Sequence, residues 1–218
     1  MALTTTQKTF EHGLGYGVFF PLTDEGYGAG VEIKGLRAQT EDPETSTTQI
    51  WADMTGTAFY SQNGATTRTT SITSLGYPEA MQTHALGKTK KNGWLINDPN
   101  QYKSFALAFA EWHVNASTGK SVYQVNVYYQ LQASAPSVER AADEEDLTAT
   151  EKPIECNVVT SELAGTDFAS FIIDIDDPAD ENKWIYDSIY TQGKLVTPND
   201  EKPADLGTQS LDFEEHTA

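Results

Sequence analysis

The sequence predicts a single, mainly β domain with a flanking helix, and three observations support this fold class. Runs of apolar and β-branched residues recur at strand-like lengths, separated by clusters of Gly, Pro, Asn and Asp. Of the 218 residues, 38% are hydrophobic and 11% are aromatic, which suffices for a core of large side chains. The chain length suits one large β domain, which we assign to residues 16–196.

In the N-terminal half, the predicted elements are short and lie between polar segments. Residues 1–15 are polar and predict an extended N-terminal arm. The elements expected after it are strands at 17–22 and 31–33, a long polar loop at 37–48, a hairpin at 50–75 that turns at Asn63-Gly64, a helix at 78–86, a basic turn at 88–93 and a strand at 94–96. The strand after Asn63-Gly64 is Thr-rich and polar on both faces, which favours a position facing water or a neighbouring subunit.

The strongest strand signals lie in the second half of the chain. Residues 104–114 are nearly all apolar, so we expect this strand to be covered on both faces. Residues 121–132 alternate, which predicts one apolar face and one wet face; these are Tyr123, Val125, Val127, Tyr129 and Leu131 against Gln124, Asn126, Tyr128, Gln130 and Gln132. The remaining elements are strands at 150–160 and 168–175, an amphipathic helix at 178–190 and an acidic C-terminal arm at 197–218.

The expected core consists of large apolar residues on these strands and on the last helix. They are Phe105, Leu107, Phe109, Trp112, Tyr123, Val125, Val127 and Trp184. The four tryptophans, Trp51, Trp94, Trp112 and Trp184, are each expected to fill the core or a helix face. The second interpretation is that they form a sugar-binding platform. A carbohydrate-binding β-sandwich therefore stays open as an alternative function.

The charge balance is strongly acidic, with 32 Asp and Glu against 14 Lys and Arg and a formal net charge of -18. Residues 139–218 carry 21 of the acids and 5 of the bases, so most of the negative charge lies in this part. Such a surface repels phosphate groups, which excludes tight DNA binding but suits a protein past which DNA slides. The single cysteine, the lack of a signal-peptide pattern and the lack of a membrane-span pattern predict assembly in the cytoplasm.

No catalytic or metal-ligating pattern is present in the sequence. The best cation candidate is the acidic cluster Asp174, Asp176, Asp177, Asp180 and Glu181, but it lacks the spacing and the Gly of a calcium loop. Cys156 falls in an alternating strand and is expected to be a core residue. We therefore predict no enzyme activity and no cofactor. The basic turn at Lys88, Lys90 and Lys91 is either a solvated loop or a contact for an acidic patch on a neighbouring copy.

Three stretches, taken in order, resemble the major tail protein family of siphophages that infect Gram-positive bacteria. The first is 51–64, a strand with Ala-Asp that ends in Asn-Gly. The second is 75–96, a strand, a proline-led helix ending in Leu-Gly, then Lys-Asn-Gly and an apolar strand. The third is 105–159, which contains Ala-x-x-Pro-Ser, an acidic connection and a strand opening with Pro-Ile. Ala135 departs from the pattern, because the family often has Arg there, and the two arms match no part of it.

The resemblance implies a tail-tube-type β-sandwich or barrel whose extended hairpins form an inner β-barrel when six copies assemble into a ring. Rings would then stack into a hollow tube in the virion tail, through which DNA passes without specific binding. The implied partners are the tape measure protein and the tail terminator and distal tail proteins.

In the tube that the resemblance implies, the extended strands, the segment 37–48 and the two arms have different expected roles. The strands of 50–75 and 104–132 are expected to build the inner barrel, with Thr66, Arg68, Thr70, Gln124, Asn126 and Gln130 as candidate residues. The segment 37–48 and both arms are expected to make ring-to-ring contacts, with Arg37, Glu41, Asp42 and Glu44 as candidates. Deletion of 37–48 is then expected to block polymerisation while leaving a folded monomer. The alternatives are another virion or injection-system tube or terminator component, and the carbohydrate-binding module.

Overall fold

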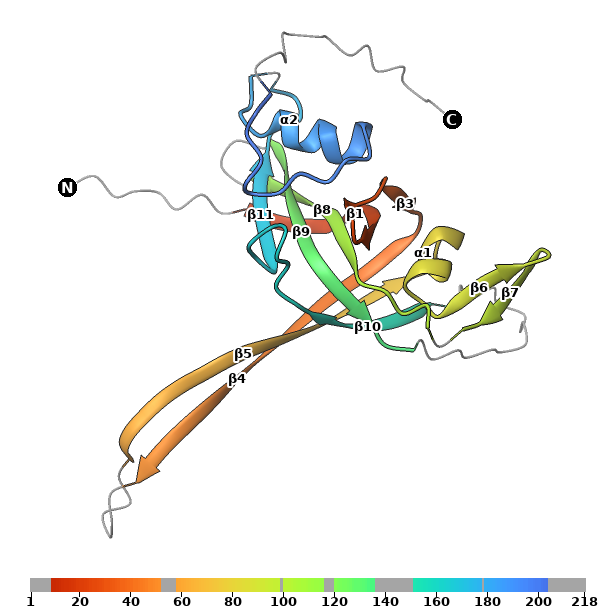
Figure 1. The fold of residues 1–218 in the computed structure, drawn as a ribbon. Helices are drawn as coiled ribbons and strands as arrows, with labels where there is room; N and C mark the ends of the chain where they lie inside the picture. Colours follow the sequence, from red (N-terminus) through yellow and green to blue (C-terminus); the bar gives the residue numbers. More distant parts are fainter. Residues whose placement is uncertain are drawn as a thin grey trace, which may run out of the picture.

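One antiparallel sheet of nine strands dominates the described part of the chain (Figure 1). The computed structural model describes residues 9–51, 58–98, 100–115, 120–135, 151–177 and 179–203. The strands of this sheet are β1 (Thr9–Thr23), β2 (Gly26–Tyr27), β3 (Val31–Ile33), β4 (Leu36–Trp51), β5 (Ala58–Ser74), β8 (Phe105–Asn115), β9 (Ser121–Ala133), β10 (Lys152–Val158) and β11 (Phe168–Ile173). A separate hairpin contains β6 (Lys88–Lys91) and β7 (Trp94–Asn97), and the helical elements are α1 (Glu79–His84), α2 (Lys183–Tyr186) and the π-helical turn η1 (Asp187–Thr191). The predicted mainly β fold with a flanking helix is confirmed.

The strand order is β2-β1-β8-β9-β10-β5-β4, with β3 on β1 and β11 on β9. The central strands β8 and β9 are buried on both faces, as the apolar run at 104–114 predicted for β8. Side chains of β8 alternate between two core clusters: Phe105, Leu107 and Phe109 lie in one and Ala106, Ala108 and Ala110 in the other. The first cluster is covered by α1, and the second by α2 and η1.

Strand β9 differs from the predicted pattern of one apolar and one wet face. On the predicted wet face, Asn126 and Tyr128 are buried within the chain, whereas Gln132 is exposed. Leu131 lies in the same cluster as Tyr128, since the register shifts between the pairs Phe105–Leu131 and Leu107–Tyr128. An irregularity of this kind changes which face a side chain occupies.

Both predicted arms contain residues that lie on the body of the protein. Strand β1 begins at Thr9 and pairs with β8 from Thr9 onward, so residues 9–15 belong to the sheet rather than to an arm. At the other end, the side chain of Asn199 donates a hydrogen bond to the Ala164 carbonyl at 3.3 Å. Residues 1–8 and 204–218 of the predicted arms lie outside the described residues.

The last helix begins later than predicted, because aspartate side chains hold the residues before it in turns. The Asp180 carboxylate accepts hydrogen bonds from the backbone N–H of Asn182 at 2.8 Å and of Asp174 at 2.9 Å. Side chains that bond nearby backbone groups compete with helix formation. The predicted helix at 178–190 is therefore reduced to α2 and η1.

Candidate functional site

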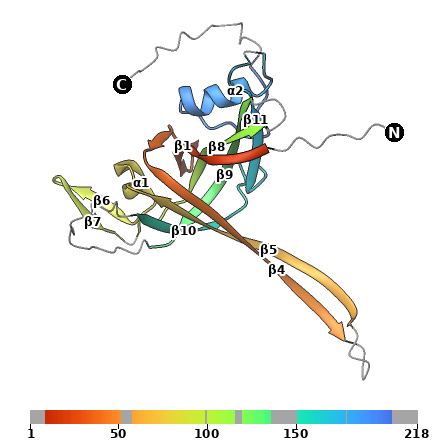
Figure 2. The same ribbon diagram turned by 180° about the vertical axis from the view of Figure 1, so that it is seen from behind.

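The long hairpin β4–β5 leaves the body of the protein as a two-stranded ribbon (Figures 1 and 2). The two strands pair from Leu36–Ser74 to Trp51–Ala58. Strand β10 covers the other edge of β5 only as far as Arg68. Beyond that point, in the residues that the structure describes, each strand of the ribbon has a single neighbour.

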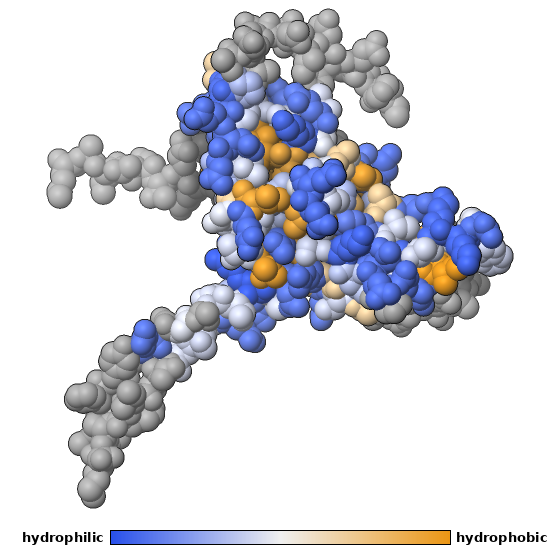
Figure 3. Space-filling model, viewed as in Figure 1, coloured by the Kyte–Doolittle hydropathy of each residue, from blue (hydrophilic) through white to orange (hydrophobic). Residues whose placement is uncertain are grey.

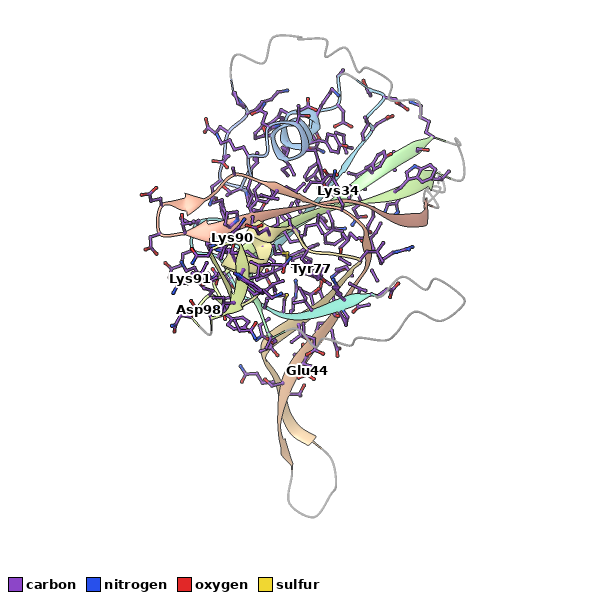
Figure 4. The ribbon with its side chains drawn as sticks, turned by 90° about the vertical axis from the view of Figure 1, so that its right-hand side faces the viewer. Lys34, Glu44, Tyr77, Lys90, Lys91 and Asp98 are labelled. Atoms are coloured by element: carbon purple, nitrogen blue, oxygen red, sulfur yellow. The ribbon has the colours of Figure 1, made fainter. Side chains whose placement is uncertain are left out.

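Beyond the body, the side chains of the ribbon that the structure describes are mostly polar and exposed to water. Residues 41–47 are all exposed, and so are Thr66 and Thr67 on the facing strand. The hydroxyls of Thr45 and Thr66 form a cross-strand hydrogen bond of 2.9 Å. Figure 4 shows Glu44 on the part of the ribbon that extends from the body. A two-stranded hairpin is marginally stable by itself in water, and open strand edges are templates for pairing with another chain.

Two predictions about this region are wrong. The segment 37–48 is not a loop but most of β4, and its candidate residues Arg37, Glu41, Asp42 and Glu44 lie on that strand. The Asn63-Gly64 pair is not a hairpin turn, since β5 continues through it and residues 52–57 join the strands.

At Asn63-Gly64 the register shifts between the pairs Thr45–Thr66 and Thr47–Asn63, which is the pattern of a β-bulge. A Cβ atom on Gly64 would clash with the Ser46 hydroxyl oxygen, so a larger residue at this position would require the Ser46 side chain to rotate.

A polar network ties the base of the ribbon to the body. Arg68 lies 3.6 Å from the Glu41 carboxylate and 3.5 Å from that of Asp167. The Tyr128 hydroxyl of β9 donates a hydrogen bond of 2.5 Å to Glu41, and Gln39 donates one of 2.9 Å to the Tyr128 hydroxyl oxygen. Burial, and next the neighbouring Glu41, raise the pKa of Tyr128, so it remains a proton donor at neutral pH. The network fixes the direction in which the ribbon leaves the body.

We expect Tyr128→Phe to lower the free energy of unfolding by about 1–2 kcal/mol, because it removes a hydrogen bond to a charged group. Chemical denaturation measures this value. Thr67→Val is the control, since the Thr67 hydroxyl is exposed on the ribbon and makes only a long hydrogen bond of 3.4 Å. Equal stability of wild type and Tyr128→Phe would contradict a role for the network in anchoring the ribbon.

The candidate barrel residues fall into two groups. Thr66, Arg68 and Thr70 lie on β5, at or near the exposed ribbon. Gln124, Asn126 and Gln130 lie on β9, which has neighbours on both edges: β8 on one, and β11 and β10 on the other. Asn126 is only 4% exposed and accepts a hydrogen bond from Gln124 at 3.3 Å. Asn126 is therefore packed within the subunit, whereas Gln124 and Gln130 are half-buried. The barrel role of 104–132 stays a prediction, and the open edges of the β4–β5 ribbon make the ribbon the stronger candidate for that role.

The predicted core residues differ in burial. Phe105, Leu107, Phe109, Val125 and Val127 are buried, whereas Trp112, Tyr123 and Trp184 are half-buried. The expectation that Trp94 fills a core is wrong, because it is 76% exposed.

Aspartate side chains of the acidic cluster at 174–181 accept hydrogen bonds from nearby backbone N–H groups. Besides the bonds of Asp180, Asp174 accepts one from the Asp176 N–H at 3.1 Å and Asp177 accepts one from the Ala179 N–H at 2.9 Å. Within the described ranges, no group of three or more His, Cys, Asp or Glu side chains could hold a metal ion. In that same part of the chain, no helix has the length and apolar character needed to cross a membrane.

Cys156 lies in the core with 1% of its surface exposed, and burial raises the pKa of its thiol to about 12. We expect the native protein to be inert to a thiol reagent at about pH 8 and to react once it is denatured. Rapid labelling of the native protein would contradict the buried position.

The raised pKa also makes stability depend on pH. Below the ordinary pKa of 9.0 the Cys156 thiol is protonated in both the folded and the unfolded protein. As the pH rises from there to about 12, it ionises only in the unfolded protein, so stability falls. Cys156→Ala should reduce the fall in the free energy of unfolding between pH 9 and about pH 12, as measured by denaturation at several pH values.

The exposed polar ribbon and the sheet that is covered on both faces agree with a structural protein. The phage tail tube protein family matches residues 25–169, which is more than half of the chain. This range includes the whole ribbon and both central strands. The search of curated proteins found no match. The chain belongs to the phage tail tube protein family.

Proposed function

We propose that this protein polymerises as stacked hexameric rings into the hollow tube of a siphophage tail, through which DNA is delivered. The observation that carries the proposal is the β4–β5 ribbon, with open strand edges and exposed polar side chains on β4 and β5. Its membership of the tail tube family supports tube assembly from copies of one chain.

Closure into a barrel explains how such a ribbon can exist without uncontrolled aggregation. If the ribbon of each copy pairs with those of its two neighbours, every open edge gains a partner. A closed barrel is the arrangement of strands that removes all edges, and a ring of identical subunits closes it by rotation. In this assembly the ribbons become the inner wall of the tube.

The charge of the ribbon suits a channel for DNA. Glu41, Asp42 and Glu44 are exposed along β4, and the whole chain has a net charge of -18. Negative groups near the channel repel phosphates, so DNA moves through without adhering. We extend the proposal to ring-to-ring contacts by both arms and by the exposed residues of 37–48. It also includes contacts with tape measure, terminator and distal tail proteins, and assembly in the host cytoplasm.

Negative-stain electron microscopy of the purified protein over a range of concentrations tests the proposal. We expect hollow filaments or sixfold rings that become more numerous as the protein concentration rises. A monomer at every concentration, confirmed by sedimentation, would contradict tube formation. Copy number in intact particles separates a tube subunit, with many rings, from a terminator, with about one ring.

A further inference from the structure

A second, smaller hairpin projects from the body on the side of α1 (Figure 1). Lys88–Lys91 of β6 pairs with Trp94–Asn97 of β7. The turn between them is Asn92-Gly93, with φ angles of 51° and 81°, as a tight type I′ turn requires. The predicted basic turn at 88–93 is strand β6 followed by a tight turn, and the predicted strand at 94–96 is β7.

Polar contacts at its base hold this hairpin in one orientation. Lys90 forms an ion pair of 2.7 Å with Glu79 of α1, and the Thr89 hydroxyl donates a hydrogen bond of 2.8 Å to Asp98. Lys88 donates one of 3.1 Å to the Gln82 side chain. Figure 4 shows Lys90, Lys91 and Asp98 on the same side of the molecule. The hairpin is therefore preorganised, which lowers the entropy cost of binding a partner.

Strand β7 exposes a run of large apolar side chains. Trp94 is 76% exposed, Leu95 42% and Ile96 47%. Figure 3 shows an apolar patch on the projecting hairpin, with hydrophilic residues beside it. An exposed patch with a hydrophilic rim is typical of a protein contact surface, and Trp is the residue type most enriched at binding hot spots.

The hairpin is also positively charged in a strongly acidic protein. It contains Lys88, Lys90 and Lys91 and no acidic residue, whereas the chain carries 32 acids against 14 bases. The partner surface that fits it best is apolar at its centre and acidic at its rim.

The same chain presents such a surface at the end of β11. Ile172 is 58% exposed, and the turn that follows exposes Asp176, Asp177 and Glu181. Strand β11 and the β6–β7 hairpin lie on opposite sides of the body in both views (Figures 1 and 2). A head-to-tail contact needs two different, complementary patches on one subunit, and it closes into a ring when the rotation from copy to copy completes a full turn.

We propose that the β6–β7 hairpin of each copy docks onto the β11–α2 turn of the next copy, with Trp94 against Ile172 and Lys91 facing the Asp176 region. This inference rests on the proposed assembly into rings and adds the surface that joins neighbours outside the ribbons.

Charge reversal with compensation tests this contact. Lys91→Glu and Asp176→Lys each place like charges at the interface, so we expect each to raise the protein concentration needed for assembly about tenfold. Because the variant that carries both changes restores opposite charges at every contact, it should return to within about threefold of wild type. Lys34→Glu is the matched control, since its side chain is 85% exposed at a different turn. Light scattering against concentration gives the threshold, and circular dichroism verifies folding.

The outcomes separate this inference from the proposed function. If wild type forms no rings or tubes, the proposed function fails. If wild type assembles and the two reversals behave like Lys34→Glu, only the docking contact is overturned. Loss of assembly in both single variants without recovery in the combined variant overturns the pairing of these two surfaces.

Crosslinking provides a measurement that does not depend on charge reversal. A variant with Lys91→Cys and Asp176→Cys, which keeps Trp94 and Ile172 in place, is treated with a short bifunctional maleimide and should give a ladder of covalent oligomers only when assembled. Wild type, with Cys156 buried, should give none. Monomers alone from the assembled variant would overturn the contact.

Discussion

A variant whose β4–β5 ribbon is cut short is expected to fold but to form no tube. Replacement of residues 45–66 by Asn-Gly joins Glu44 to Thr67, which face each other in the hairpin. The variant loses several potential backbone hydrogen bonds between copies. At about 1 kcal/mol each, they account for more than a 100-fold rise in the concentration needed for assembly.

The shortened protein keeps everything that the hairpin contributes to the core. Leu36 and Ile72 remain in the first cluster, and the network of Gln39, Glu41, Arg68 and Tyr128 remains at the ribbon base. This is a cleaner test than deletion of 37–48, which would remove the core end of β4 along with the ribbon. Electron microscopy measures assembly, and a cooperative thermal transition verifies folding. The full-length variant with Thr45→Ser and Thr66→Ser keeps the hydroxyl pair and should assemble. Normal tubes from the shortened variant would show that the ribbon does not form the inner wall.

The body of the fold could be predicted from sequence, because its strands carry their own periodic signal. The apolar run of β8, the alternation in β9 and the proline-led helix α1 all lie close to their predicted positions. Local patterns of this kind depend on burial within a single chain. The predicted start of the last helix was wrong. The Asp180 carboxylate accepts a hydrogen bond from the backbone N–H of Asp174, and this contact depends on where the chain folds back.

The ribbon could not be recognised because its composition resembles that of a loop. Residues 41–47 are polar and include Pro43, and the sequence correctly indicated that they face water. Exposure does not distinguish a loop from a strand whose partners are other copies, and Pro is tolerated on an edge strand such as β4. The Thr-rich partner strand was the available signal, since β-branched residues favour strands. The contacts of Tyr128 with Glu41 and of Arg68 with Asp167 join distant segments, so no local pattern predicts them.

The largest stability loss is expected from Phe105→Ala at the centre of the first core cluster. Phe105 is fully buried, and its ring centroid lies 5.3 Å from that of Phe19 on β1. It also pairs in register with Leu131 of β9, so its ring fills space between β1, β9 and α1. Removal of a buried aromatic ring leaves a cavity that a close-packed sheet cannot fill by small shifts.

We expect this substitution to lower the free energy of unfolding by about 3–5 kcal/mol and the Tm by roughly 6–20 °C, as measured by denaturant titration and calorimetry. Leu163→Ala is the control, because Leu163 is 51% exposed and its truncation leaves no enclosed cavity. If Phe105→Ala costs no more than Leu163→Ala, the tight packing of β8 against β1 is wrong. Tubes formed by Phe105→Ala at low temperature would show that the core supports the subunit, while the ribbon and the small hairpin, which the substitution leaves intact, join the copies.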